Sequence, residues 1–303
     1  MLHALEMLAK LKAPITVVAH DAGAANHISA WLGTSIMSTV NGSFCGPAKD
    51  IFGRQCPWMS NAHFSELIPQ CNTLISGTGW ASSFEHDARK LAKQVGCRSI
   101  AVIDHWTNYR ARFVRDGEEV LPDEIWVTDE YAKRLAEIEF PGIRVVHMQN
   151  SYLENLVSEV REQERGKVVS HDGNILYVLE PIRQAWGSSG QPGEFQALDF
   201  FVANLEVLRL DGNAPIKLRP HPSDAVGKFD QWIESKKGLK ISLDASSTLA
   251  ESIAWADVVV GCQTYAMVVA LAAGRRVISS IPSWAPTCIL PQAEILKLAD
   301  LVR

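Results

Sequence analysis

The sequence lacks the features that mark several large classes of protein. None of its six cysteines forms a CxxC pair, and none has the spacing of a zinc finger. The longest apolar stretch, Met267 to Ala273, is far shorter than the roughly 20 residues that a membrane-spanning helix needs. The net charge is −5, so the chain has no excess of basic residues and is not expected to bind nucleic acid. These features are typical of a cytoplasmic protein, in which the cysteines are expected to be buried and reduced.

Several catalytic and cofactor motifs are also missing. The sequence contains no HExxH and no HxH, so neither a structural nor a catalytic metal is expected. It contains no GxGxxG, no Walker loop and no GxSxG, so dinucleotide binding, P-loop chemistry and a serine hydrolase are not indicated. No cofactor is therefore expected. The first 20 residues are not a signal peptide, because Glu6, Lys10 and Lys12 interrupt the apolar run.

The chain does contain a regular alternation of short apolar runs and amphipathic stretches. The 303 residues correspond to about two domains. Near-continuous apolar runs predict strands that are covered on both faces, and the stretches between them predict crossover helices. Strands are predicted at 15–19, 73–76, 99–103, 124–127, 143–146, 174–179, 214–219, 239–242, 258–261 and 276–279. Helices are predicted at 24–32, 82–95, 129–138, 153–164, 195–208, 229–236, 249–255 and 265–273.

A charged stretch that contains no aromatic residue, Glu159–Gly173, is the best candidate for a linker. The same strand and helix pattern begins again after it. The sequence therefore predicts an α/β protein of two Rossmann-like domains that face a central cleft. The predicted domains are residues 1–160 and 170–303.

The most specific local signal is Arg219-Pro220-His221-Pro222, which directly follows a predicted strand. Ligands bind beyond the carboxyl ends of strands in open α/β sheets. Each proline stiffens the loop, and both Arg219 and His221 can donate hydrogen bonds to a phosphate. The alternative is that the histidine only caps a neighbouring helix.

Two further segments of the second half place polar groups at helix starts. Asp244–Thr248 contains Ser246 and Ser247, and Gln263-Thr264 lies between a strand and a helix. Helix N-termini attract anions, so these segments are expected to bind the phosphate of a donor, although ordinary capping explains each of them equally well. Glu180, at the end of the first strand of this domain, is expected to meet the base or ribose.

Residues 175–285 resemble the donor-binding domain of GT-B-type glycosyltransferases, and in detail that of bacterial sialyltransferases, polysialyltransferases and Kdo transferases. His221-Pro222 is similar to their HP motif, and Ser246-Ser247 to their hydroxyl motif. Gln263-Thr264 resembles a strand–helix element of teichoic-acid-type polymerases. The resemblance implies a CMP-activated sugar donor whose phosphate is held by the histidine and the two serines.

In the first half, His20 and Asp21 follow the first strand and precede Gly23. Asp21 and Gly23 resemble the acidic-then-glycine motif of the same families, in which the carboxylate is the general base. Ala22 departs from that pattern, because a second acid often stands there. A carboxylate or a histidine is needed to take the proton from an attacking hydroxyl. The alternative is that Asp21 only caps the following helix.

Two other strand ends are predicted to bind the acceptor. Both combine residue types that suit a sugar surface: glycines that permit close approach in one, and acid, imidazole and indole groups in the other. The residues are Gly77, Thr78 and Gly79, and Asp104, His105 and Trp106. Arg110, Arg112 and Arg115 follow and offer positive charge for an acidic acceptor or donor carboxylate. A plain turn and a solvated loop are the alternatives.

Together these features predict an inverting, metal-independent glycosyltransferase that builds a surface glycan from a nucleotide-sugar donor. Its partners would be that donor, a glycan or other hydroxyl acceptor and, by peripheral association at the inner face of the membrane, enzymes of envelope biosynthesis. A nucleotide-sugar hydrolase or epimerase is the alternative enzyme. A non-catalytic protein that binds nucleotide or glycan is the third hypothesis. The oligomeric state does not follow from the sequence.

Overall fold

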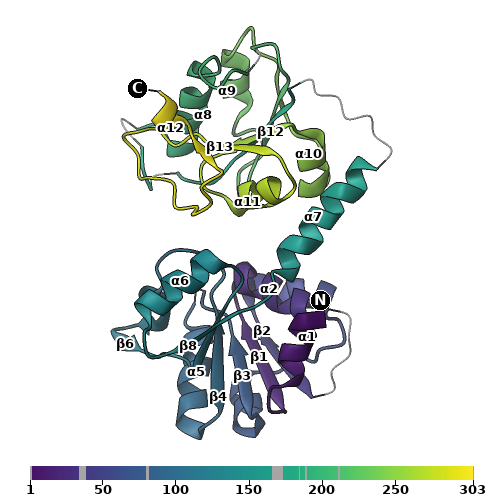
Figure 1. Cartoon of the computed structure of the whole chain (residues 1–303), viewed down its shortest axis with the longest axis vertical. Coiled ribbons are helices and arrows are strands. Elements are labelled where there is room, and N and C mark those ends of the chain that lie inside the picture. Colours follow the sequence, from purple (N-terminus) through teal and green to yellow (C-terminus); the bar gives the residue numbers. More distant parts are fainter. Residues whose placement is uncertain are drawn as a thin grey trace. The chain divides into compact units, whose positions relative to one another are not determined.

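The computed structural model describes residues 2–33, 39–79, 82–165, 173–183, 185–187, 190–210 and 212–302. The chain forms two compact α/β units, Met1–Tyr152 and Leu153–Arg303 (Figure 1). The second unit begins inside helix α7 (Ser151–Glu164), before the whole of the charged stretch that the sequence marks as a linker. Residues 166–172 of that stretch lie outside the described residues.

Unit 1 is built on a six-stranded parallel sheet in the order β2-β1-β3-β4-β7-β8. Its strands are β1 (Ile15–Ala19), β2 (Val40–Phe44), β3 (Thr73–Ser76), β4 (Arg98–Val102), β7 (Glu124–Val127) and β8 (Arg144–His147). The strand predictions are confirmed for five of these within two residues at each end. The sixth, β2, was not predicted, because its sequence VNGSF reads as a turn.

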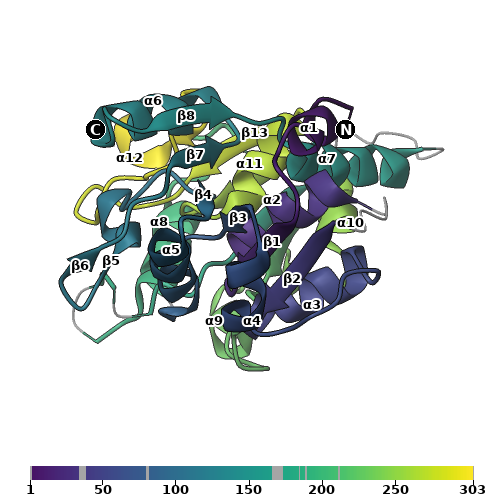
Figure 2. The ribbon, with the colours of Figure 1, turned by 90° about the horizontal axis from the view of Figure 1, so that it is seen from below.

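Helices cover both faces of this sheet. They are α1 (Leu2–Ala9), α2 (Ala22–Leu32), α3 (Gly46–Gln55), α4 (Phe64–Leu67), α5 (Phe84–Val95) and α6 (Glu130–Glu139), with 3-10 turns η1 (Ile68–Gln70) and η2 (Arg110–Phe113). A short hairpin, β5 (Val114–Arg115) and β6 (Glu118–Glu119), follows η2. Figure 2 shows α5 and α3 among these elements from another side.

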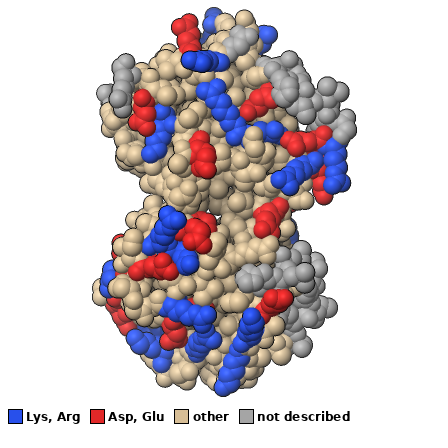
Figure 3. All heavy atoms as spheres, viewed as in Figure 1, with Lys and Arg blue, Asp and Glu red and all other residues tan. Residues whose placement is uncertain are grey.

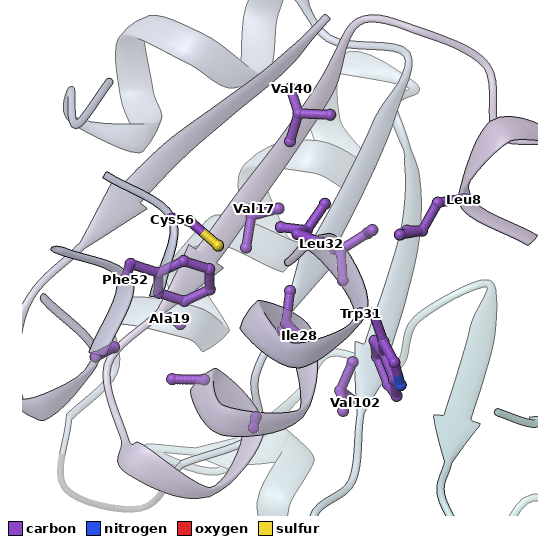
Figure 4. Packing of buried hydrophobic residues seen from close by; sticks show 14 of the residues in the cluster. Leu8, Val17, Ala19, Ile28, Trp31, Leu32, Val40, Phe52, Cys56 and Val102 are labelled. Carbon is purple, nitrogen blue, oxygen red and sulfur yellow. The ribbon is translucent and has the colours of Figure 1, made fainter. Parts of the chain in front are cut away.

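The side chains of β1 point alternately to the two faces of the sheet, and on each face they pack against helices. Val17 and Ala19 pack with residues of α1, α2 and α3, among them Ile28 and Phe52 (Figure 4). Val18 points to the other face and packs with buried residues of η1 and α5. Because successive side chains of a strand point to opposite faces, β1, all of whose residues are buried, is covered from both sides.

Unit 2 repeats this architecture with a different strand order, β11-β10-β9-β12-β13-β14. Its parallel strands are β9 (Ile175–Val178), β10 (Ile216–Arg219), β11 (Ile241–Leu243), β12 (Val258–Gly261), β13 (Arg276–Ser279) and β14 (Leu296–Lys297). The helices are α8 (Gly193–Ala203), α9 (Asp230–Ser235), α10 (Leu249–Trp255), α11 (Tyr265–Ala272) and α12 (Leu298–Leu301). The expected helix 195–208 ends earlier, at Ala203.

The strand orders locate a switch point in each sheet, where the chain passes from one side of its first strand to the other. In unit 1 the switch lies between β1 and β3, and in unit 2 between β9 and β12. Ligands of open α/β sheets bind beside the carboxyl ends of the strands at such points. We therefore expect a ligand to bind at the loops that follow these strands.

The surface charges, the helices and the cysteines each add one observation. Basic and acidic side chains are intermixed on the face of each unit shown in Figure 3. Among the described residues, no helix combines the length and the apolar character needed to cross a membrane. All six cysteines are free, but Cys45 and Cys71 are half-buried, so the expectation that every thiol is buried is wrong for these two.

Candidate functional site

Residues from three strand ends of unit 1 meet at its switch point. The loops after β1, β3 and β4 together line a cavity of about 270 Å³. The lining residues are Asp21, Ala24, Gly79, Asp104, His105, Thr107 and Arg112. Five of these were suggested by the sequence: Asp21, Gly79, Asp104, His105 and Arg112.

His20 and Asp21 form a hydrogen-bonded pair at one side of the cavity. His20 Nδ1 lies 2.5 Å from Asp21 Oδ1, and 19% and 27% of the two side chains are exposed. A carboxylate only accepts, so Nδ1–H donates, and in the neutral imidazole Nε2 carries the lone pair. The imidazole lies against Gly46, where a Cβ would be 2.8 Å from Nε2. Asp21 Oδ1 makes no capping hydrogen bond to α2, although Asp21 occupies the N-cap position.

Asp104 and Arg112 form an ion pair on another side. Arg112 Nη1 lies 2.8 Å from Asp104 Oδ1, and the same Nη1 also donates to the carbonyl and hydroxyl oxygens of Thr78. Arg112 Nε donates to the Thr107 carbonyl. Only 5% of the Arg112 side chain is exposed, against 22% for Asp104, so the carboxylate is the more exposed partner.

His105 completes the polar lining. Its Nδ1 lies 3.2 Å from Thr107 Oγ1. Burial lowers the pKa of His105, and the guanidinium of Arg112 lowers it further, while Asp104 acts in the opposite direction. The imidazole is therefore neutral at physiological pH and offers a lone pair or an N–H, but no charge.

The remaining predicted acceptor residues are turned into the protein. Thr78 is buried, and its hydroxyl donates to the Val102 carbonyl. Trp106 is also buried, and its indole N–H donates to Asp129, the N-cap residue of α6. Gly77 is buried beneath the carboxylate of Glu85. These three residues support the loops of the cavity from behind.

Sequence reasoning missed Glu85, which joins two of these loops. Its buried carboxylate accepts the backbone N–H of His20 at 2.9 Å and that of Gly79 at 2.5 Å. A Cβ at Gly77 would lie 2.1 Å from Glu85 Oε1, so only glycine fits there. Burial raises the pKa of Glu85, although both hydrogen bonds and the charge of Arg89 act against that shift. The only sequence signal is a glutamate in the first turn after a Gly-Thr-Gly loop.

Glycine at position 23 makes room for Asp104. A Cβ there would lie 1.6 Å from Asp104 Oδ2. We therefore expect Gly23→Ala to displace the carboxylate and to lower the free energy of unfolding by about 1–3 kcal/mol, the usual cost of overpacking. Gly53, also inside a helix, has no atom within 4 Å of its Cβ position. Gly53→Ala should be neutral or stabilise by up to about 1 kcal/mol. Equal denaturation midpoints for the two variants would contradict the close approach.

In unit 2 the switch point is bridged by Glu180 and Gln263. Glu180 Oε2 accepts the backbone N–H of Gln263 at 3.0 Å, which ties the loop after β9 to the loop after β12. Burial raises the pKa of Glu180. Gln263 Oε1 accepts the N–H of Ile289, and Thr264 is the N-cap residue of α11.

Arg219, at the end of β10, is held by the loop after β11. Its Nη1 lies 2.8 Å from Asp244 Oδ2 and also donates to the Ser252 hydroxyl and the Ser246 carbonyl. Ser246 donates to Asp244 Oδ1 in the same loop, and Ser247 donates to Glu251 in the first turn of α10, so both hydroxyls have partners nearby in the sequence. Among the described residues no partner is found for Nε or Nη2 of Arg219, and 24% of its side chain is exposed.

His221 is oriented by its own turn. The backbone N–H of Ser223 donates to His221 Nδ1 at 3.1 Å, so Nδ1 is the acceptor and the hydrogen of the neutral imidazole is on Nε2. The backbone N–H of His221 donates to Asp224, whose carboxylate also binds Lys228. The ring is half-buried, and Pro222 beside it is exposed. His221 is therefore a fixed N–H donor at the carboxyl edge of the sheet.

No set of three or more histidine, cysteine or acidic side chains is gathered as a metal site within the described part of the chain. The groups that could take part in binding or catalysis at the two switch points are carboxylates, imidazoles, guanidinium groups and backbone N–H groups.

Comparison with known proteins identifies the type of fold. Neither a protein-family model nor a curated protein sequence matches the chain. Solved structures do match, and they show that the two parallel-sheet units have the GT-B type of fold.

Two of the matching structures illustrate the similarity. One, with a TM-score of 0.58 and 10% identity, is a putative UDP-N-acetylglucosamine 2-epimerase from Listeria monocytogenes; the match covers 88% of this chain and 79% of that one. The other is a complex of S. aureus MnaA with UDP, with a TM-score of 0.55 and 11% identity over 88% and 78% of the two chains. At this identity the likeness concerns the fold alone.

Proposed function

We propose that the chain is a glycosyltransferase that uses a nucleotide-sugar donor, with unit 1 binding the acceptor and unit 2 the donor. The observation that carries the proposal is the His20–Asp21 pair beside the cavity of unit 1. An inverting transfer needs a base that takes the proton from the attacking hydroxyl, and this pair supplies either a carboxylate oxygen or Nε2 of an imidazole that a carboxylate orients.

The donor phosphate would be bound in unit 2 without a metal. His221 Nε2–H and the guanidinium of Arg219 are the groups that would stabilise charge developing on the leaving phosphate. Ser246, Ser247, Gln263 and Thr264 would add backbone N–H groups or, after rearrangement, hydroxyls. The similarity of His221-Pro222 to the HP motif supports a CMP-linked sugar as donor, with enzymes of envelope biosynthesis as partners.

An epimerase is the second candidate, and one observation favours it. The cavity of unit 1 contains two carboxylates, Asp21 and Asp104, and a neutral imidazole, His105, and an epimerase needs such groups to move protons. The fold is also that of a putative 2-epimerase. Acceptor-free incubation separates the candidates. A transferase leaves the nucleotide-sugar unchanged, whereas an epimerase converts the sugar, and a hydrolase releases it.

A thermal-shift screen of CMP, UDP and their sugar conjugates tests donor binding directly. A ligand at 100 times its dissociation constant stabilises the folded protein by about 2.7 kcal/mol. A response selective for CMP would support the sialyltransferase-like branch, and one selective for UDP would support a different donor. No response to any nucleotide would contradict the proposed function.

We expect His221→Ala to weaken binding of the preferred nucleotide by roughly 10- to 100-fold, because it removes one hydrogen bond to a charged group worth about 1.5–3 kcal/mol. His63→Ala is the matched control, since His63 Nδ1 also accepts the N–H of a serine two residues later but lies in unit 1. Titration calorimetry on both variants gives the comparison. Equal affinities would remove His221 from the phosphate site.

A further inference from the structure

We infer that the cavity of unit 1 binds a neutral, hydroxyl-rich sugar and discriminates against acidic ones such as uronates, sialates and sugar phosphates. The inference rests on the proposed function and specifies the chemical class of its acceptor. The juxtaposition that carries it is that of two half-buried carboxylates with arginines whose hydrogen bonds are directed to the protein itself.

The carboxylates of Asp21 and Asp104 lie very close to backbone atoms of the cavity. They can do so because the residues they contact, Gly79 and Gly23, have no side chain. A Cβ at Gly79 would lie 2.0 Å from Asp21 Oδ2, and Gly23 leaves the corresponding room beside Asp104. Both side chains line the cavity and are partly exposed. Carboxylate oxygens only accept hydrogen bonds, so their natural partners are hydroxyl groups.

The nearby positive charges form their hydrogen bonds with groups of the protein itself. The Arg112 guanidinium is nearly buried and binds Asp104, Thr78 and Thr107. Arg115 donates to the carbonyl oxygens of Gly79, Ala111 and Val114.

Arg110 forms its ion pair with Glu119, outside the cavity lining. The structure therefore differs from the expectation that these three arginines offer charge to an acidic ligand. Their hydrogen bonds hold the loops of the cavity together instead.

The charge balance of the lining follows. Asp21 and Asp104 contribute two negative charges and Arg112 one positive charge, while His105 is neutral at physiological pH. His20 is not among the lining residues, so the lining has an excess of negative charge. An anionic group that enters the cavity would be repelled by the carboxylates of Asp21 and Asp104. The repulsion is stronger there than in bulk water because the cavity is partly desolvated.

Two probes that share one pyranose ring test this: glucose and glucuronate. Their binding to the full-length protein is measured by ligand-observed NMR at about pH 8 without any nucleotide. Two unit charges about 6 Å apart interact by roughly 3 kcal/mol at an effective dielectric constant of 20, and salt reduces this. We therefore expect glucose to bind at least about tenfold more tightly than glucuronate. Tighter or equal binding of glucuronate, or binding of neither sugar up to its solubility limit, would overturn the inference.

The variant Asp104→Asn tests which group discriminates against glucuronate. It removes one negative charge and leaves the charge of Arg112 unbalanced by Asp104, so the glucose-to-glucuronate affinity ratio should fall by about tenfold or reverse. Asp50→Asn is the control, because Asp50 is exposed on α3 and does not line the cavity. If Asp104→Asn shows a lower melting temperature than the control, Asp21→Asn gives the same test. An affinity ratio unchanged from that of Asp50→Asn would contradict the role of the carboxylates.

The outcome is separable from that of the proposed function. The NMR measurement needs neither donor nor turnover, so a failure of nucleotide binding in unit 2 leaves its result standing. In the same way, transfer of sugar by this protein to an acidic acceptor would refute the inference about the acceptor while supporting the proposal that the protein is a glycosyltransferase.

Discussion

Replacement of Asp21 by Asn is expected to lower sugar transfer by about 10²- to 10⁴-fold, the range in which a general base contributes. The amide cannot take a proton, and it no longer fixes the Nδ1–H tautomer of His20. Nucleotide affinity should stay nearly unchanged, because the donor groups belong to unit 2. Single-turnover rates with donor and acceptor, together with calorimetric binding of the nucleotide, measure the two effects separately.

The control for this prediction is Asp50→Asn, the same change at an exposed position of α3. Transfer retained in Asp21→Asn would remove Asp21 from the base role and from the orientation of His20. A parallel His20→Asn variant divides those roles. A loss as large as that of Asp21→Asn indicates Nε2 as the proton acceptor, and a small loss indicates the carboxylate.

The strands that could be predicted most closely from the sequence are those buried along nearly their whole length. β1, β3, β7, β12 and β13 lie within one residue of their predicted bounds because ITVVA-type runs leave little ambiguity. β2 could not be found, since Gly42 and Asn41 look like a turn and the strand is stabilised by pairing with β1. Strand order depends on such pairings, so the switch point of unit 1 did not follow from local patterns.

The candidate site was predicted where it depends on the carboxyl ends of parallel strands, because those ends meet at one edge of a sheet. Asp21, Gly79 and Asp104 met this rule and line one cavity. The direction of a side chain does not follow from the rule. Thr78 and Trp106 stand at the same strand ends and are buried, since each finds a hydrogen-bond partner inside the unit.

The same limit applies to the charged residues of unit 2. Arg219 stands where a phosphate ligand was expected, yet its Nη1 binds Asp244, which is 25 residues further along the chain. A pairing between loops of different strands has no local sequence signature. In unit 1, Glu85 was overlooked for the same reason: the two backbone N–H groups that donate to its carboxylate are brought there by the packing of α5 against β1 and β3.

Replacement of Arg89 by Met is expected to lower the free energy of unfolding of unit 1 by about 2–5 kcal/mol, because a buried hydroxyl and a buried carbonyl lose a charged donor and the Glu85 carboxylate loses a nearby positive charge. Arg89 is buried, and its Nη1 donates to Ser76 Oγ at 3.1 Å and to the Gly77 carbonyl at 2.7 Å. Burial lowers the pKa of Arg89 to about 10, and the negative charge of Glu85 opposes that shift. Methionine keeps most of the volume, so the loss reports on charge and hydrogen bonds.

Denaturant unfolding of Arg89→Met and of Arg54→Met tests this expectation. Arg54 is exposed in the last turn of α3, and its replacement should change stability by no more than about 0.5 kcal/mol. Adding Glu85→Gln to Arg89→Met should restore part of the lost stability, because the uncompensated carboxylate is then gone. If Arg89→Met were as stable as Arg54→Met, or if the double variant were less stable by the sum of both single losses, the compensation of Glu85 by Arg89 would be excluded. The two hydrogen bonds of Glu85 to the loops that carry His20 and Gly79 would then be independent of the charge of Arg89.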